Sequence, residues 1–135
     1  MTKVYTDTNI FLDIVEDRKN LLGKDIATPA GKIFFRAMLC KFHLIISTWT
    51  LKEIYRHVKP EEITMLFAMI KKKIITVKYD KQDMEKAKQK SQDNFDDALH
   101  IVLAEKEGAD FIITRNVDHF IKIGTKITIK KPENL

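Results

Sequence analysis

Short apolar runs alternate along the chain with longer segments in which apolar residues recur at the spacing of a helix face. Runs of this length, rich in Ile, Val, Phe and Thr, predict buried strands. The predicted strands are Lys3–Thr6, Phe42–Ile46, Ile74–Lys78, Asp110–Thr114 and Lys126–Ile129.

The segments between these runs predict helices. The predicted helices are Asn9–Val15, residues 30–40, Thr48–Val58, a helix that begins at Pro60 and is closed by Lys71–Lys73, a helix from Asp80 or Asp83 to Lys90, Asp96–Glu107 and Asn116–Ile121. Ser47 suits the residue before a helix, and Gly108 suits the residue just after one. We expect the tail, Lys130–Leu135, to be loose.

Alternation of strands and helices predicts an α/β fold with three α/β/α layers around a central parallel sheet of about five strands. The length of 135 residues suits a single domain that spans residues 1–135. Right-handed crossovers place the carboxyl ends of all strands along one edge of such a sheet. Ligands bind outside that edge in open α/β sheets, so we expect the functional residues there.

Composition indicates the charge of a partner and the cellular compartment. Lys and Arg number 24 against 19 Asp and Glu, and the net charge of +5 suits an anionic partner. The one cysteine, Cys40, excludes an intrachain disulfide and fits a reducing compartment. The sequence has neither a signal peptide nor an apolar stretch of about 18 residues, so we expect a cytoplasmic protein with no membrane partner.

Asp7 is the first candidate functional residue, because it directly follows the first predicted strand and is aimed at the crevice. A second interpretation is that Asp7 only caps the following helix, which is a common use of Asp. Glu53 and Asp97 lie on helices that begin near the same edge. Carboxylates gathered there are the ligands that Mg²⁺ and Mn²⁺ prefer, and such ions activate water for phosphodiester hydrolysis.

Four segments in chain order resemble the PIN domain family, and together they span nearly the whole chain: VYTDTNIFLD, STWTLKEI, NFDDALHIVLA and ITRNVDHF. The resemblance implies a metal-dependent nuclease that uses Mg²⁺ or Mn²⁺. Many small members of the family are VapC-type toxins of toxin–antitoxin pairs. The implied function is therefore an endoribonuclease with RNA as substrate and an antitoxin protein as partner. A homodimer is implied as well, in line with the apolar helices at residues 30–41 and 60–71.

By position in these motifs, Asp7 matches the first acidic residue of the family, Glu53 the second and Asp97 the third. The fourth position differs, because the family often has Asp where Asn116 stands. Asn116 can contribute an amide oxygen or hold a water, and Asp118 is the alternative source of charge. The resemblance thus implies a catalytic set of Asp7, Glu53, Asp97, Asn116 and Asp118, with metal ligands Asp7, Glu53, Asp97 and Asp118.

Several polar residues accompany this set. Asn9, Ser47, Thr114 and Arg115 are candidates to orient ligands or bind phosphate of the substrate. For Thr8 we favour a role in capping and turns. His100 lies on the same helical face as Asp97 and either serves the site or is a histidine packed beside it.

Two other functions stay open from the sequence. One is an RNA-processing nuclease that has no antitoxin. The other is a non-catalytic RNA-binding or PIN-like interaction module, or a phosphoreceiver with Asp7 in its acidic pocket. A receiver needs an Asp at the end of a middle strand, whereas the strand ends here read Ser47 and Tyr79–Asp80.

Overall fold

The computed structural model describes residues 2–15 and 41–135. The predicted helix over residues 30–40 and the surroundings of Cys40 lie outside these ranges. Among the residues described, no helix combines the length and the apolar character needed to cross a bilayer.

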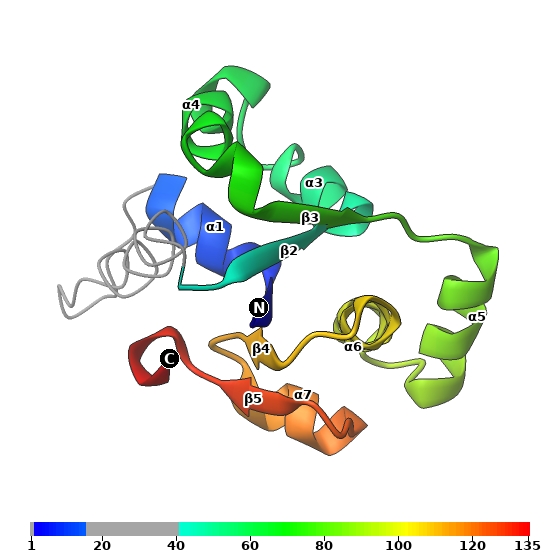
Figure 1. Cartoon of the computed structure of the whole chain (residues 1–135). Coiled ribbons are helices and arrows are strands. Elements are labelled where there is room, and N and C mark those ends of the chain that lie inside the picture. The colour runs from blue at the N-terminus through cyan, green and yellow to red at the C-terminus, as the bar shows by residue number, and fades with distance from the viewer. Residues whose placement is uncertain (1, 16–40) are drawn as a thin grey trace, which may run out of the picture.

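A five-stranded parallel sheet forms the centre of the fold, in the order β3-β2-β1-β4-β5 (Figure 1). The strands are β1 (Lys3–Thr6), β2 (His43–Ser47), β3 (Ile74–Val77), β4 (Phe111–Ile113) and β5 (Thr128–Lys130). Strand β1 is central, and its Tyr5 pairs in register with Ile45 of β2 and Ile112 of β4. The parallel sheet of about five strands predicted from the sequence is confirmed.

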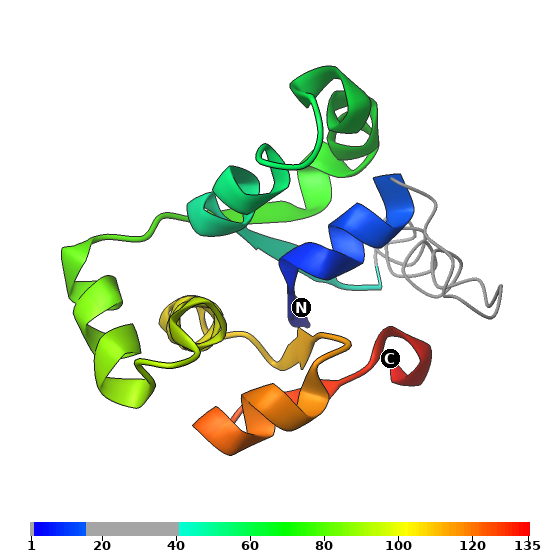
Figure 2. The ribbon, with the colours of Figure 1, turned by 180° about the vertical axis from the view of Figure 1, so that it is seen from behind.

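Helices cover both faces of the sheet (Figures 1 and 2). The helical segments are α1 (Thr8–Val15), α3 (Thr48–Ile54), α4 (Pro60–Ile70), η1 (Lys71–Lys73), α5 (Lys81–Lys90), α6 (Phe95–Glu107), α7 (Val117–Ile123) and η2 (Pro132–Asn134). Residues from α1, α3 and α4 pack in one core, and residues from α5, α6 and α7, together with Trp49 of α3, pack in the other. The three-layer architecture follows from these two cores.

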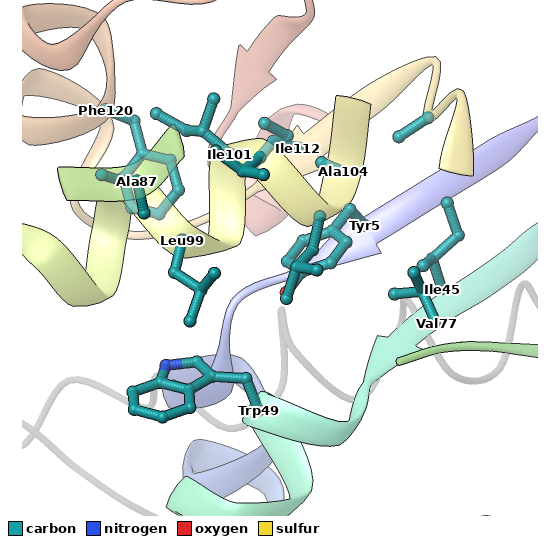
Figure 3. Close-up of a cluster of buried hydrophobic side chains, with 14 residues drawn as sticks. Tyr5, Ile45, Trp49, Val77, Ala87, Leu99, Ile101, Ala104, Ile112 and Phe120 are labelled. Atoms are coloured by element: carbon teal, nitrogen blue, oxygen red, sulfur yellow. The ribbon is translucent and has the colours of Figure 1, made fainter. Parts of the chain in front are cut away.

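Strand β1 divides the two cores by the alternation of its side chains. Val4 packs with α1 and α4, whereas Tyr5 points to the opposite face and packs with α6. Figure 3 shows Tyr5 in this second core, near Leu99 of α6 and Trp49 of α3. Tyr5 therefore brings a hydroxyl group into this layer, where it meets the buried side chains of His100 and Ser47.

Local caps explain the starts of α3 and α5 and the end of α6. The Ser47 side chain accepts a hydrogen bond from the backbone N–H of Thr50 and begins α3, as predicted. Asp80 and Asp83 form a capping box at the start of α5, which resolves the two predicted starts in favour of Asp80. Gly108 ends α6 with a φ of 73°, a left-handed conformation that glycine adopts without strain.

The helix predicted over Thr48–Val58 is shorter in the structure and ends at Ile54. The backbone N–H groups of Arg56 and His57 turn back to carbonyls three residues earlier. Pro60 disfavours helical backbone at the residue before it, which is consistent with a break before α4. Val58 still reaches the core, where it is buried with Ile63.

The tail is ordered, so the prediction of a loose C-terminus was wrong. Residues Pro132–Asn134 form η2, and Pro132 is buried. Glu133 forms an ion pair with Arg115, at 2.9 Å between Oε1 and Nη1. Leu135 packs against the core that contains α1. This contact could not be predicted from the sequence, because Arg115 and Glu133 are distant from each other along the chain.

Candidate active site

Asp7 lies at the carboxyl end of the central strand, with its side chain almost completely buried. Its backbone N–H donates to the carbonyl of Ile113 at 2.9 Å, which continues the pairing of β1 with β4. The hydroxyl of Thr114, just past the end of β4, donates to Oδ2 of Asp7 at 2.8 Å. Two adjacent strands thus fix this carboxylate from its backbone and from its side chain.

The pKa of Asp7 is raised above its ordinary value, chiefly because burial penalises the charged form. The nearby charge of Glu53 also raises it, whereas His100 and the Thr114 hydrogen bond lower it by less than the total rise. A buried carboxylate with a raised pKa gains from any cation placed beside it.

Glu53, in the last turn of α3, receives two hydrogen bonds on the same oxygen. The hydroxyl of Thr8 donates to Oε1 at 2.7 Å, and Nε2 of His100 lies 2.8 Å from that oxygen. An ionised carboxylate only accepts hydrogen bonds, so Nε2 is the donor. Thr8 therefore contacts a candidate site residue, beyond the role in capping and turns that its position after Asp7 suggested.

His100 of α6 is buried between the two acidic residues. Its Nε2 lies 3.7 Å from Oδ1 of Asp7, in addition to the contact with Glu53. Its Nδ1 lies 2.6 Å from the hydroxyl of Tyr5, which donates to Oγ of Ser47 at 3.0 Å. Because the proton of Tyr5 goes to Ser47, its oxygen accepts from Nδ1–H. Both ring nitrogens then carry protons.

The pKa values of the His100–Glu53 pair agree with a charged pair. Burial alone would lower the pKa of His100, but Tyr5, Glu53 and Asp7 together raise it well above 6.5. Burial alone would raise the pKa of Glu53, but the hydrogen bond and charge of His100 and the Thr8 hydroxyl bring it below its ordinary value. The imidazolium therefore keeps Glu53 ionised.

Asp97 lies in the first turn of α6, with its side chain 22% exposed. Its pKa is raised first by burial and then by the negative charge of Asp7. The two carboxylates are thus close enough to repel one another. His119 of α7 is on the solvent side, with Nδ1 3.8 Å from Oδ2 of Asp97.

The fourth position of the acidic set lies at the start of α7. Asn116 is the residue before this helix, and its backbone N–H donates to the Thr114 hydroxyl at 3.0 Å. The backbone at Asn116 is therefore tied, through Thr114, to Asp7. Asp118 is exposed in the first turn of α7. Among the interactions found within residues 2–15 and 41–135, none joins Asp118 to the other three carboxylates.

The four residues expected to bind substrate occupy different environments. Asn9 is exposed on α1, whereas Ser47 and Thr114 are fully buried and make the internal hydrogen bonds described above. Arg115 donates through Nε to Asp13 at 2.6 Å and through Nη1 to Glu133 at 2.9 Å. Its guanidinium therefore joins α1 to the C-terminal segment.

Sequence reasoning missed Tyr5 and Asp13. Both are buried polar residues within apolar runs, and a buried polar group needs a partner. That signal indicates that a partner exists without identifying it. The partners, His100 and Arg115, are 95 and 102 residues away along the chain.

A divalent ion fits the donor chemistry of the site, because oxygen ligands are those that Mg²⁺ and Mn²⁺ prefer. Asp7 and Asp97 repel each other, and an ion between them would relieve the repulsion. In the described part of the chain, no three acidic, histidine or cysteine side chains are close enough to hold one ion. Glu53 is engaged by His100 instead.

Comparison with known proteins places this geometry in a family. The model of the PIN domain family matches residues 3–118. One similar solved structure is VapBC2 from Rickettsia felis bound to a DNA fragment from their promoter, with a TM-score of 0.65, 13% identity and coverage of 96% of this chain and 98% of that chain. Another is a toxin–antitoxin complex from Klebsiella pneumoniae, with a TM-score of 0.64, 19% identity and coverage of 96% and 97%.

A third similar structure is FitAB bound to an IR36 DNA fragment, with a TM-score of 0.58, 12% identity and coverage of 98% of this chain and 96% of that chain. A search by sequence among curated proteins gave no match. At these identities the solved structures establish the fold. The family match extends over most of the sequence, from β1 to the start of α7, and the chain belongs to the PIN domain family.

Proposed function

We propose that this protein is a metal-dependent endoribonuclease that hydrolyses RNA phosphodiester bonds. The observation that carries the proposal is the approach of Asp7 and Asp97 at the carboxyl edge of the sheet, where the charge of Asp7 raises the pKa of Asp97. Like-charged side chains placed together at a partly buried site are typical of a site for a cation. Membership of the PIN domain family, whose members are generally nucleases, supports this interpretation.

Asp7 and Asp97 would hold Mg²⁺ or Mn²⁺, with Glu53 and the start of α7 beside them. Asn116 and Asp118 are the two candidates at α7. The ion supplies the chemistry of activating water and stabilising charge on phosphate. Asp118 would need to turn inward from its exposed position to take part.

The protein's own residues prepare the site for this chemistry. Thr114 orients Asp7 through Oδ2, which leaves Oδ1 directed toward His100. His100 and Thr8 hold Glu53 ionised. Because these contacts are buried and hydrogen-bonded, the carboxylates are kept in place before any ligand binds.

The substrate side of the site has exposed positive charge. Lys52 of α3 and Arg56, which follows the end of this helix, lie over the ring of Trp49, at 5.5 Å and 5.8 Å from its centroid. Arg56 is near enough to Glu53 to lower its pKa. We assign RNA phosphate contacts to these two cations and to exposed Asn9. Ser47, Thr114 and Arg115 position protein groups instead.

The biological role we infer is that of the toxin in a VapBC-type pair. Two of the similar structures are described as VapBC2 and as a toxin–antitoxin complex, and the alignment covers nearly all of each matched chain. An antitoxin protein is the partner expected on this basis, and a homodimer remains our proposal for assembly. A neighbouring reading frame for a short DNA-binding protein would separate a toxin from a processing nuclease that has no antitoxin.

Cleavage assays test the activity directly. Purified protein with Mn²⁺ or Mg²⁺ should cut single-stranded or loop regions of RNA, and EDTA should stop the reaction. Asp97→Asn should remove the cleavage, whereas Asp96→Asn, which changes the exposed neighbour, should retain it. A wild-type preparation that leaves a broad panel of structured RNAs intact with Mn²⁺ would contradict the catalytic proposal.

A non-catalytic RNA-binding module is the second candidate, and two observations favour it. Asn116 replaces an acidic residue, and no complete three-ligand group is assembled within the described residues. In that case RNA binding should persist in EDTA. Lys52→Gln with Arg56→Gln should weaken that binding and reduce the slope of its salt dependence by about 2.

A further inference from the structure

We propose that Tyr5 is a positioning residue of the active site, which holds Glu53 in place by fixing the ring of His100. The inference rests on the proposed metal-dependent nuclease function. It assigns a role to a strand residue whose hydroxyl contacts Ser47 and His100. Tyr5 acts through a continuous set of hydrogen bonds that joins β1, α6, α3 and β2.

A series of hydrogen bonds connects strand β1 to the acidic site. Tyr5 donates to Ser47 at 3.0 Å and lies 2.6 Å from Nδ1 of His100. Nε2 of His100 lies 2.8 Å from Oε1 of Glu53. The hydroxyl of Tyr5 is therefore the connection between a buried strand and the far nitrogen of the ring that binds Glu53.

Both ends of α3 are held by this set of contacts. Ser47, whose side chain caps the first turn, accepts from Tyr5, and Glu53, in the last turn, accepts from His100. Thr50 reinforces the first end, because its backbone N–H and its hydroxyl each lie 2.9 Å from Oγ of Ser47. The helix is thereby fixed relative to α6, and with it the distance from Glu53 to Asp97.

Removal of the Tyr5 hydroxyl leaves Nδ1 of a fully buried ring without a partner. A buried polar group that loses its partner costs free energy, so the ring would turn or shift to find another acceptor. Rotation about the side-chain bonds of His100 also moves Nε2, which breaks the bond to Glu53. Glu53 would then lose the orientation that a cation at the acidic site requires.

Tyr5→Phe isolates this effect because the ring itself belongs to the core. Tyr5 packs edge-on to His100, with ring centroids 5.6 Å apart, and lies in the cluster that includes Ile45 and Leu99. Phenylalanine keeps this packing and removes one oxygen. Tyr79→Phe is the matched control, because Tyr79 is a partly buried ring packed on the same core.

The experiment compares wild type, Tyr5→Phe and Tyr79→Phe in a titration with Mn²⁺, followed both by the rise in melting temperature and by RNA cleavage. Tyr5→Phe should stay folded and should need on the order of 10- to 100-fold more Mn²⁺ for half of either effect, as is typical when a hydrogen-bonded group beyond the metal ligands is lost. The KM for RNA at saturating Mn²⁺ should remain that of wild type. Tyr79→Phe should titrate as wild type.

A double-mutant cycle with Glu53→Gln separates positioning from general stability. If Tyr5 acts through Glu53, adding Tyr5→Phe to Glu53→Gln should not weaken the Mn²⁺ response further. Equal Mn²⁺ titrations of wild type and Tyr5→Phe, or fully additive losses in the double mutant, would overturn the positioning role. A wild-type protein that neither responds to Mn²⁺ nor cleaves RNA would overturn the proposed function, and the positioning role would fall with it.

Discussion

The hydroxyl of Thr114 donates to Oδ2 of Asp7 at 2.8 Å, so a side-chain bond joins the carboxyl ends of the adjacent strands β1 and β4. Thr114 is completely buried and also accepts from the backbone N–H of Asn116. One hydroxyl thereby aligns the buried carboxylate of the site with the start of α7, where the fourth position of the acidic set lies.

Replacing Thr114 by Val should destabilise the protein and reduce its activity. Valine nearly keeps the shape of threonine and removes the side-chain donor to Asp7, which should lower the free energy of unfolding by about 1.5–3 kcal/mol, as for a hydrogen bond to a charged group. Urea denaturation measures the free energy of unfolding. Thr76→Val, at an exposed position of β3, should change it little. An equal effect of the two substitutions would exclude a special role for the Thr114 hydroxyl.

Arg115→Gln distinguishes a structural role for this arginine from contact with substrate phosphate. The guanidinium pairs with Asp13, whose side chain is 3% exposed, so its removal leaves a buried carboxylate without its cation. We expect the free energy of unfolding to fall by about 2–3 kcal/mol. This is less than the roughly 3–5 kcal/mol lost when a fully buried pair is broken, because the side chain of Arg115 is itself 24% exposed.

Arg115→Gln should destabilise the protein less in an Asp13→Asn background, because the buried negative charge that Arg115 neutralises is then absent. Lys122→Gln removes an exposed cation from α7 and serves as the control for net charge. If Arg115→Gln instead kept full stability and raised the KM for RNA, the arginine would belong to the substrate site.

The sheet could be predicted from the sequence because each strand is a buried apolar run and each helix has local start or stop signals. The alternation of Val4 and Tyr5 across β1 follows from strand geometry alone. Asp7 was found for the same reason, since the end of the first strand of a parallel sheet is a fixed place. Helix ends that depend on tertiary packing, such as Ile54, were misplaced.

The contacts within the site could not be predicted to the same extent. Residues such as Tyr5 and His100, or Asp13 and Arg115, meet only after strands and helices have assembled. A polar residue in an apolar run indicates that a partner exists, but many residues satisfy that chemistry. The ordered tail was missed for the same reason, because Glu133 and Leu135 are held by distant groups.

Stability should depend on pH through His100. Its pKa is raised in the folded state above the ordinary value of 6.5, so the folded protein binds the proton more tightly than the unfolded chain. The resulting stabilisation is fully present below pH 6.5 and is lost as the pH rises through the folded-state value. Melting temperatures measured without metal should therefore fall as the pH is raised above 6.5.

His100→Gln should flatten this decline, because glutamine keeps a donor but does not titrate. His57→Gln, at an exposed position beyond α3, should preserve the slope of the wild type. A His100→Gln protein with an unchanged pH slope would show that folding does not raise the pKa of His100.

The final prediction concerns Asp97, whose pKa is raised by burial and by the charge of Asp7. An acid with a raised folded-state pKa binds its proton more tightly when folded, so stability falls as the pH rises from its ordinary value of 3.8 through the folded-state value. At pH 7 the charged form is therefore a cost to the metal-free protein. Asp97→Asn removes that charge and should melt at the same or a higher temperature without metal.

With Mn²⁺, the wild-type protein should melt at a higher temperature than Asp97→Asn. An ion that binds only the folded wild type at a hundredfold excess over its Kd adds about 2.7 kcal/mol. For a domain of this size that is a rise in melting temperature of roughly 10 °C. Asp97→Asn should gain much less and lose cleavage, while Asp96→Asn should behave as wild type in both. If Asp97→Asn melts lower without metal and still gains fully from Mn²⁺, then Asp97 is a structural residue and the cation binds elsewhere.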